Sequence, residues 1–491
     1  MEFVYIRTKL TGSICAVRRA FSAAPGVALL LNTWMVIGVG AAESRPNILF
    51  ISVDDLRPEI GAYGATVKTP NFDRLAASGM RFDRAYCQQA VCGASRLSIM
   101  SGLYPTVTGE QSFHVNGWRK RHPNLITMNQ HFGTNGYNTI GVGKIYHDSR
   151  GPGGDRDSWK QWISIGVSQY ALPENLELEQ AAQQQNKGGA HDPPKGPTTE
   201  MADVPDDTYR DGKIARRTSD MLRQLARSPD SPFFLAVGFT KPHLPFVAPK
   251  KYWDLYQRSD FAMPSNAGIP PGYPRDAANP IANEMQMYSD YEGKAPTYFS
   301  DEMNRRLLHG YAACVSYTDA NIGVILDTLK TTGLDKNTIV VLWGDHGWKL
   351  GDHSSWCKHT NFECDTRVPL IVRAPGKKTG VASSRLVELI DLFPTLCHAA
   401  RIPTPAHCQG RSFLKLLDDP ETGHRRTAYS SYPAHNTIGH SIRFSKYRYT
   451  EWRLNEDTDK VSHRVLTDLA ADPGEVTNVI DDPAHSEALQ D

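Results

Sequence analysis

A cysteine and an arginine four residues apart are the residues of this chain that point most directly to chemistry. The segment from Cys92 to Arg96 reads C-G-A-S-R, and its small residues, followed by an apolar run, are typical of a helix start. Cys92 then lies at the helix N-terminus, where free N–H groups and the helix dipole favour anions. Arg96 follows one turn later on the same face and can pair with an anion there. The pattern indicates a reactive cysteine beside an anion site, or else a half-buried cysteine and a structural arginine.

Two other segments place carboxylates directly after apolar runs. Asp54 and Asp55 follow the run NILFISV, and Asp345 and His346 follow the run TIVVLWG. Adjacent carboxylates repel each other, so a buried pair requires a cation nearby. Oxygen ligands of this kind suit a hard divalent ion such as Ca²⁺. Each segment alone also fits a turn with a capped helix, but together they predict a metal site.

The elements that must position these residues alternate between strand and helix patterns. The predicted buried strands are residues 47–53, 138–142, 233–237, 338–343 and 369–372, and the predicted helices are 71–78, 207–227 and 305–329. Such alternation predicts an α/β core with a largely parallel sheet, in which catalytic groups collect at the carboxyl ends of the strands. Residues 183–206 and 258–300 resemble loops. After residue 378, a helix and short strands predict a smaller C-terminal subdomain.

Length, charge and the N-terminal residues limit the class of protein. A chain of 491 residues is long enough for one large domain and a smaller one. The net charge of +1 gives no reason to expect nucleic acid or a membrane surface as a partner. Residues 1–42 carry basic residues, an apolar stretch and small residues, which predicts a signal peptide and export. An uncleaved N-terminal anchor is the alternative reading.

Eight cysteines occur, one of them in the presumed leader. If Cys92 is converted chemically, an even number remains in the mature chain. The two short-range pairs, Cys397–Cys408 and Cys357–Cys364, are the first candidates for disulfides, although connectivity does not follow from sequence.

The order of these motifs resembles that of the type I sulfatases. V-D-D near the N-terminus, C-x-A-S-R and the downstream G-D-H-G occur in the family's order, and the segments 141–147, 240–246 and 467–478 are also similar to it. Within the family, V-D-D-L-R-P and D-H-G-W-x-L-G-x-H look most like the iduronate-2-sulfatase subgroup. Ala94 stands where animal members have proline, a departure common in bacterial sulfatases.

The resemblance implies a fold and a domain division. The fold is expected to be α/β and alkaline-phosphatase/sulfatase-like, with a large mixed, mostly parallel sheet sandwiched by helices and a smaller C-terminal α+β subdomain. Residues 43–378 are expected to form the catalytic domain and residues 379–491 the C-terminal subdomain.

The resemblance also implies the site residues and cofactors. The cysteine of this family is oxidised to formylglycine by a formylglycine-generating or other sulfatase-maturating enzyme, and the formylglycine hydrate is the nucleophile. One Ca²⁺ is expected, with ligands Asp54, Asp55, Asp345, His346 and the modified Cys92. The residues expected in catalysis are Cys92, Arg96, Lys144, His147, His243 and Lys358. Substrate contacts are expected from Lys144, His243, Trp348 and Lys358.

The implied reaction is hydrolysis of a sulfate ester on a sulfated saccharide, with the 2-O-sulfate of iduronate or another uronate as the expected substrate. Arg96 and a lysine would bind the sulfuryl oxygens, and His243 or Lys358 would protonate the leaving oxygen. Three alternatives stay open: a sulfatase for another sulfated carbohydrate, such as an algal polysaccharide; a phosphatase or phosphodiesterase of the same superfamily; and a non-catalytic glycan-binding protein with an unconverted thiol. Cys92 argues against the phosphatase, because those enzymes usually have Ser or Thr there.

Overall fold

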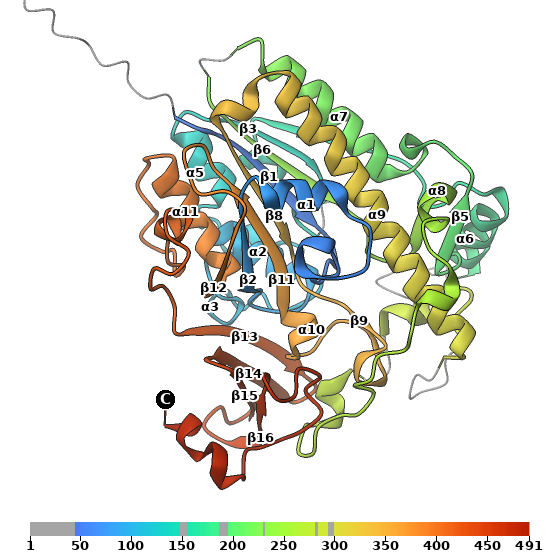
Figure 1. Ribbon diagram of the computed structural model, residues 1–491, viewed down its shortest axis with the longest axis vertical. Helices are drawn as coiled ribbons and strands as arrows, with labels where there is room; N and C mark the ends of the chain where they lie inside the picture. Colours follow the sequence, from blue (N-terminus) through green and yellow to red (C-terminus); the bar gives the residue numbers. More distant parts are fainter. Residues whose placement is uncertain are drawn as a thin grey trace, which may run out of the picture. The chain divides into compact units, whose positions relative to one another are not determined.

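A mixed eight-stranded sheet lies at the centre of the structure, a computed structural model that describes residues 45–147, 155–185, 195–228, 231–279, 283–292 and 299–490. The strand order is β12-β2-β11-β8-β1-β6-β3-β4 (Figure 1). The strands are β1 (Asn47–Val53), β2 (Met80–Tyr86), β3 (Asn138–Gly143), β4 (Gln161–Ile163), β6 (Phe233–Phe239), β8 (Thr338–Gly344), β11 (Arg367–Arg373) and β12 (Val381–Glu388). The predicted signal peptide lies outside the described residues.

The strands at the centre of this sheet are parallel and end at the same level. β1 pairs in parallel with β6 on one side and β8 on the other, and β3 continues the parallel arrangement beyond β6. β11 is antiparallel to both of its neighbours, so the sheet is mixed but mostly parallel. Val53 is in register with both Phe239 and Gly344. The residues that follow these strands therefore emerge side by side at one edge of the sheet.

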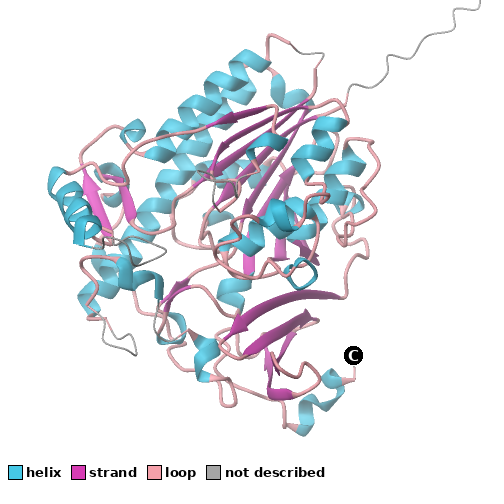
Figure 2. Ribbon diagram, turned by 180° about the vertical axis from the view of Figure 1, so that it is seen from behind, coloured by secondary structure: helices cyan, strands magenta, loops and turns pink. Residues whose placement is uncertain are grey.

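Helices cover both faces of the sheet because the buried strands are apolar on both faces. In β1, Leu49 and Ile51 face a core shared with α1 (Pro70–Ala77), α7 (Arg210–Leu225) and α9 (Asp301–Thr331). The alternate residues Ile48 and Phe50 face a second core, shared with α2 (Cys92–Ser101), α5 (Met128–Thr134) and α11 (Leu392–Ala399). Figure 2 shows the resulting arrangement of helix, sheet and helix from the opposite side. The predicted α/β core is confirmed.

A second, antiparallel sheet is formed by the C-terminal part of the chain. Its strands are β13 (Thr427–Ala434), β14 (Thr437–Phe444), β15 (Tyr447–Leu454) and β16 (Val461–Asp468), paired in sequence order. Buried and more exposed residues alternate along β14 and β15, as expected for a sheet with one covered face. β13 is attached to the loop before α2, where Ser431 N donates to Gln88 O at 2.8 Å. The division at residue 378 stays a prediction, and β12, although beyond it, belongs to the large sheet.

The remaining helices and strands have four residues or fewer, except α6, which has 13. They are α3 (Pro105–Thr108), α4 (Trp118–Arg121), α6 (Pro173–Gln185), α8 (Lys250–Trp253), α10 (Glu363–Thr366), β5 (Thr199–Ala202), β7 (Phe246–Pro249), β9 (Lys349–Leu350) and β10 (Trp356–Cys357). Among the helices of the described ranges, none has the length and apolarity needed to cross a membrane.

The described cysteines are all free thiols, so neither candidate disulfide forms in this structure. Cys357 is buried in the core, whereas Cys364 Sγ lies 3.6 Å from Asp365 Oδ1. The prediction of these two disulfides is therefore wrong for this structure. Neither of them links the C-terminal sheet to the rest of the chain.

Candidate active site

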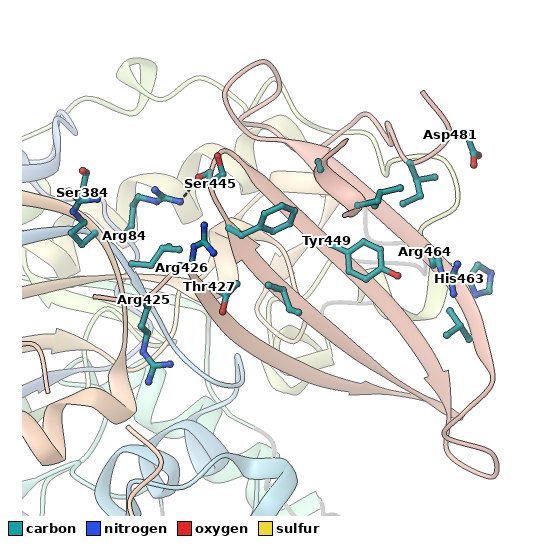
Figure 3. Close-up of a pocket in the computed structure, with 18 of the residues that line it drawn as sticks. Arg84, Ser384, Arg425, Arg426, Thr427, Ser445, Tyr449, His463, Arg464 and Asp481 are labelled. Atoms are coloured by element: carbon teal, nitrogen blue, oxygen red, sulfur yellow. Dashed lines mark hydrogen bonds between the residues drawn. The ribbon is translucent and has the colours of Figure 1, made fainter. Parts of the chain in front are cut away.

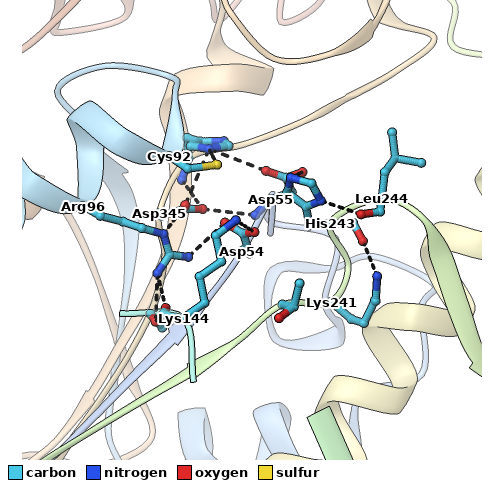
Figure 4. A network of polar contacts seen from close by, with 12 residues as sticks. Asp54, Asp55, Cys92, Arg96, Lys144, Lys241, His243, Leu244 and Asp345 are labelled. Atoms are coloured by element: carbon cyan, nitrogen blue, oxygen red, sulfur yellow. Dashed lines mark hydrogen bonds and ion pairs between the residues drawn. The ribbon is translucent and has the colours of Figure 1, made fainter. Parts of the chain in front are cut away.

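The predicted site residues meet at the edge of the large sheet where β1 and β8 end (Figure 4). Asp54 and Asp55 follow β1, and Asp345 and His346 follow β8. Asp345 Oδ1 accepts hydrogen bonds from the backbone nitrogens of Asp55 at 3.1 Å and His346 at 3.0 Å, which ties the two strand ends together. Three of the four side chains are acidic, and all four are buried, so they require cationic neighbours.

Helix α2 begins at Cys92, as predicted, and is buried along its whole length. Ser95 Oγ donates to Asp345 O at 2.6 Å and thereby fixes the first turn of the helix on the end of β8. A Cβ atom at Gly93 would lie 2.1 Å from Phe113 O, so only glycine permits this close approach. These contacts hold Cys92 against the strand ends.

Arg96 is fully buried, and its guanidinium binds groups of the protein itself. Nε donates to Asp345 Oδ2 at 2.8 Å and Nη2 donates to Asp54 Oδ1 at 3.0 Å. Nη1 donates to the backbone oxygens of Lys144 and Ile145. Arg96 thus joins the two strand ends to the helix, and its expected role in holding an anion beside Cys92 stays a prediction.

Cys92 Sγ lies 3.1 Å from His346 Nε2. The other ring nitrogen, Nδ1, is 2.9 Å from Gly347 O. A carbonyl oxygen only accepts, so Nδ1 carries the proton in the neutral ring and the lone pair of Nε2 faces Cys92. Burial raises the pKa of the Cys92 thiol well above its usual value, and Asp54 adds to the rise. An unmodified Cys92 is therefore a protonated thiol, which is a poor nucleophile at neutral pH.

Two lysines neutralise the adjacent aspartates. Lys144 Nζ is ion-paired with Asp54 Oδ2, and Lys358 Nζ lies 3.0 Å from Asp55 Oδ1. Burial opposes ionisation of Asp54, but Lys144 and Arg96 hold the pKa of its carboxyl well below the usual value. Burial raises the pKa of Asp55 to about 7, against the opposing effect of Lys358. The two neighbouring carboxyl groups therefore differ in how strongly their surroundings favour ionisation.

A buried glutamate that the sequence did not single out joins the two candidate proton donors. Glu284 Oε1 lies 2.8 Å from His243 Nε2, and Glu284 Oε2 lies 2.8 Å from Lys358 Nζ. Burial opposes its ionisation, but Lys358 and His243 hold the pKa of Glu284 well below the usual value. Glu284 lies in a short 3₁₀ turn within the segment 258–300, which has the composition of a loop. Only the folded chain brings it to Lys358.

The ligand atoms of Asp54, Asp55, Cys92 and His346 all lie within 4.8 Å of one another. This set contains four of the five predicted metal ligands. The fifth, Asp345, has its oxygens engaged by Arg96 and by backbone N–H groups. Asp55, His243 and Glu284 form a second such group, which shares Asp55 with the first.

Comparison with known proteins identifies the family. The family model described as Sulfatase matches residues 46–402, and the one described as N-sulphoglucosamine sulphohydrolase, C-terminal, matches residues 351–491. The chain belongs to the sulfatase family. It is 32% identical to the iduronate 2-sulfatase of Mus musculus, over 86% of this chain and 88% of that protein. It is 33% identical to the iduronate 2-sulfatase of Homo sapiens, over 83% of this chain and 84% of that protein.

A solved structure with bound D-glucosamine-2-N,6-O-disulfate, described as its substrate, shares the fold. The TM-score is 0.69 at 22% identity, covering 91% of this chain and 96% of that one. This sulfatase therefore has the alkaline-phosphatase-like fold expected from its motifs, and it is a sulfuric ester hydrolase by family.

The remaining predicted residues of this sulfatase lie around the charged cluster. His147 is partly exposed and contacts Phe113, with the two ring centroids 4.3 Å apart. The residue that follows Lys358 in the chain, His359, is stacked on Tyr432 of β13, with the ring centroids 5.8 Å apart. Trp348 is fully buried, and its ring lies 4.9 Å from Lys358 Nζ. The expected contact between Trp348 and substrate stays a prediction.

Proposed function

We propose that this sulfatase removes the 2-O-sulfate from iduronate or a related uronate residue of a sulfated glycosaminoglycan. The observation that carries the proposal is the buried start of α2, with Cys92 Sγ 3.1 Å from His346 Nε2 beside two lysine-paired carboxylates. The substrate follows from the two iduronate 2-sulfatases that are 32% and 33% identical to this chain. We further propose that residues 1–42 direct export and that a sulfatase-maturating enzyme converts Cys92 to formylglycine.

The ligand set of the proposed Ca²⁺ site contains Asp54, Asp55 and His346, with residue 92 as the fourth member. The residues fit such an ion, because two buried carboxylates lie side by side and the pKa of one of them, Asp55, is raised to about 7 by burial. A bound cation favours ionisation of both groups. A thiolate suits softer metals, whereas formylglycine hydrate at position 92 offers oxygen, which suits Ca²⁺. When bound, the ion supplies electrostatic stabilisation of negative oxygen atoms.

The formylglycine hydrate supplies the nucleophilic oxygen in this proposal. His346 turns Nε2 toward position 92, because Nδ1 lies 2.9 Å from Gly347 O, and Nε2 would be the nitrogen that binds the ion beside the hydrate. Lys144 and Lys358 are the cations closest to the carboxylates, and each can bind sulfuryl oxygens in fixed positions. Arg96 keeps Asp54 and Asp345 in place.

The leaving oxygen requires a proton, and we take His243 as its donor. Both ring nitrogens face acceptors, since Nδ1 lies 2.6 Å from Leu244 O and Nε2 lies 2.8 Å from Glu284 Oε1. This arrangement suits a ring that is protonated on both nitrogens. Burial lowers the pKa of His243, against the effect of Glu284, so the protonated ring releases its proton more readily. Lys358, on the same carboxylate, is the alternative donor.

A mass spectrum of the Cys92 peptide followed by a panel of sulfated disaccharides tests the proposal. Conversion to formylglycine lowers the peptide mass, and the converted enzyme should hydrolyse uronate 2-sulfates faster than glucosamine 6-sulfates. Cys92→Ala should abolish turnover and retain binding. An unmodified thiol in an inactive protein would instead support a glycan-binding homologue. Turnover of other sulfated sugars with none of any uronate 2-sulfate would exclude the proposed substrate.

A further inference from the structure

A groove lies along one face of the C-terminal sheet (Figure 3). Its volume is about 1380 Å³, larger than the ~300–1,000 Å³ typical of a small-molecule pocket. The groove extends from β2 and β12 of the large sheet to β16. Its lining includes five arginines: Arg84, Arg385, Arg425, Arg426 and Arg464. None of the proposed catalytic residues contributes to it.

The arginines of this groove differ in how far the protein neutralises them. Arg425 is paired with Asp391 at 2.5 Å, and Arg385 is paired with Glu421 at 3.1 Å. Within the described part of the chain, no ion pair involves Arg426 or Arg464, and both are exposed. Asp481 is the sole acidic residue of the lining. The groove therefore offers guanidinium groups that remain available to an anion.

The acid nearest to Arg464 along the sheet is already engaged. Glu451 is in register with Arg464 on the neighbouring strand. Its carboxylate accepts from Tyr449 Oη at 2.8 Å and from Arg453 Nε at 2.5 Å. These two bonds engage both carboxylate oxygens of Glu451. Arg464 forms no ion pair with Glu451 among the described residues, and its charge, after that of Arg453, favours the ionised carboxyl.

Between the arginines the groove has an apolar floor. Ile442, whose side chain is 38% exposed, and Tyr449 lie opposite each other on β14 and β15, and Phe444 also lines the groove. Their sequence neighbours point to the other face, where Arg448 is buried against Glu363. An apolar platform between arginines suits a sugar ring that carries sulfates, because a guanidinium binds such oxyanions through two parallel hydrogen bonds.

We propose that this groove is a second binding site for a sulfated glycan chain, separate from the active site. The class of glycan rests on the proposed function, whereas the preference for a sulfated polyanion rests on the groove itself. A single-stranded nucleic acid is the competing occupant. It would require a series of exposed aromatic rings for base stacking, and the groove provides only Tyr449 and Phe444. Such a site would hold a polymeric substrate while its end residue occupies the catalytic centre.

The test compares the enzyme with the double variant Arg426→Ala/Arg464→Ala by calorimetric titration with a size-defined heparin octasaccharide. The parent should bind two molecules per chain, and the variant should bind one, with affinity at the second site reduced roughly tenfold or more. Turnover of a 2-O-sulfated disaccharide should be unchanged. If the proposed catalytic substrate is wrong but the groove binds the glycan, the parent binds one molecule and the variant none. If the groove does not bind the glycan, the parent and the variant bind the same number of molecules, so the two failures are distinguishable.

The matched control removes the same charge from another surface. Arg217→Ala/Arg223→Ala on α7 takes away two exposed arginines and should leave both sites intact. Equal loss of binding in this control, or unchanged stoichiometry in the groove variant, would overturn the proposal. Tighter binding of a single-stranded DNA oligonucleotide through the same arginines would overturn the choice of occupant. Rescue of octasaccharide binding by Arg426→Lys/Arg464→Lys would show that the loss reflects charge and not misfolding.

Discussion

The active site and the groove of the C-terminal sheet are both rich in cations, but they hold those cations in opposite ways. At the active site, Arg96, Lys144 and Lys358 are buried and each is paired with a carboxylate. In the groove, Arg426 and Arg464 are exposed and have no such partner among the described residues. Burial explains the difference, because a buried charge without a partner costs several kcal/mol, whereas an exposed one is hydrated.

The difference has consequences for substitution. The buried charges form one network, so the loss of one member leaves its partners uncompensated and the effects are not additive. The groove arginines act independently of one another, and salt screens them. Substitutions at the active site should therefore affect stability and catalysis together, whereas substitutions in the groove should affect binding alone.

The largest effect is expected for Arg96→Ala. Asp54 and Asp345 would lose the guanidinium that joins them, and the free energy of unfolding should fall by about 3–5 kcal/mol. Arg96→Lys should be intermediate, because one ammonium cannot replace a forked donor, and displacement of the site should lower kcat by about a hundredfold. Urea denaturation and steady-state kinetics measure these effects. The contrast between the buried cations of the active site and the exposed arginines of the groove is wrong if the control Arg426→Ala destabilises the protein as much as Arg96→Ala does.

A smaller effect on stability but a clear effect on turnover is expected for Glu284→Gln. His243 and Lys358 would lose the carboxylate that both contact, and kcat should fall by about 10–100-fold, as for other residues that orient catalytic groups. The measurement is kcat and KM on a sulfated disaccharide. Glu292→Gln, an exposed glutamate of the same segment, is the control and should be silent. Equal kcat in the two variants would mean that Glu284 has no positioning role.

The last effect is confined to a range of pH and concerns Glu475, a buried carboxyl on the inner side of the C-terminal sheet. It lies 2.9 Å from Arg448 Nε, yet burial raises its pKa to about 7, and Glu363 adds to the rise. The folded protein thus binds this proton more tightly than the unfolded chain does, with its ordinary pKa of 4.5. Stability from this group is present below about pH 4.5 and is lost as pH rises through about 7, by no more than ~3 kcal/mol.

Glu475→Gln should remove that part of the pH dependence, because the amide resembles the protonated carboxyl. Urea unfolding at pH 5 and pH 8 provides the measurement. An unchanged difference in stability between the two pH values would assign the pH dependence to other groups.

The sequence predicted the elements at the centre of the molecule better than the contacts between distant loops. The strands that end in Asp54 and Asp345 follow directly from their apolar runs, and their parallel pairing brings those residues together. Arg96 was identified, but its contacts with Asp54 and Asp345 were not, since they depend on the packing of α2. Glu284 gave no signal, because one acidic residue in a loop-like segment is ordinarily solvated. The groove combines β2, β12 and β16, so no local pattern marks it.

If Cys92 is converted to formylglycine as we propose, the burial of α2 limits when the conversion can take place. All ten residues of this helix are buried, and Cys92 has no exposed surface. An enzyme that oxidises Cys92 must therefore reach it while the segment is still unfolded. Modification and folding then compete for the same chain. A molecule that folds first keeps its thiol, and the yield of active enzyme depends on the relative rates of these two processes.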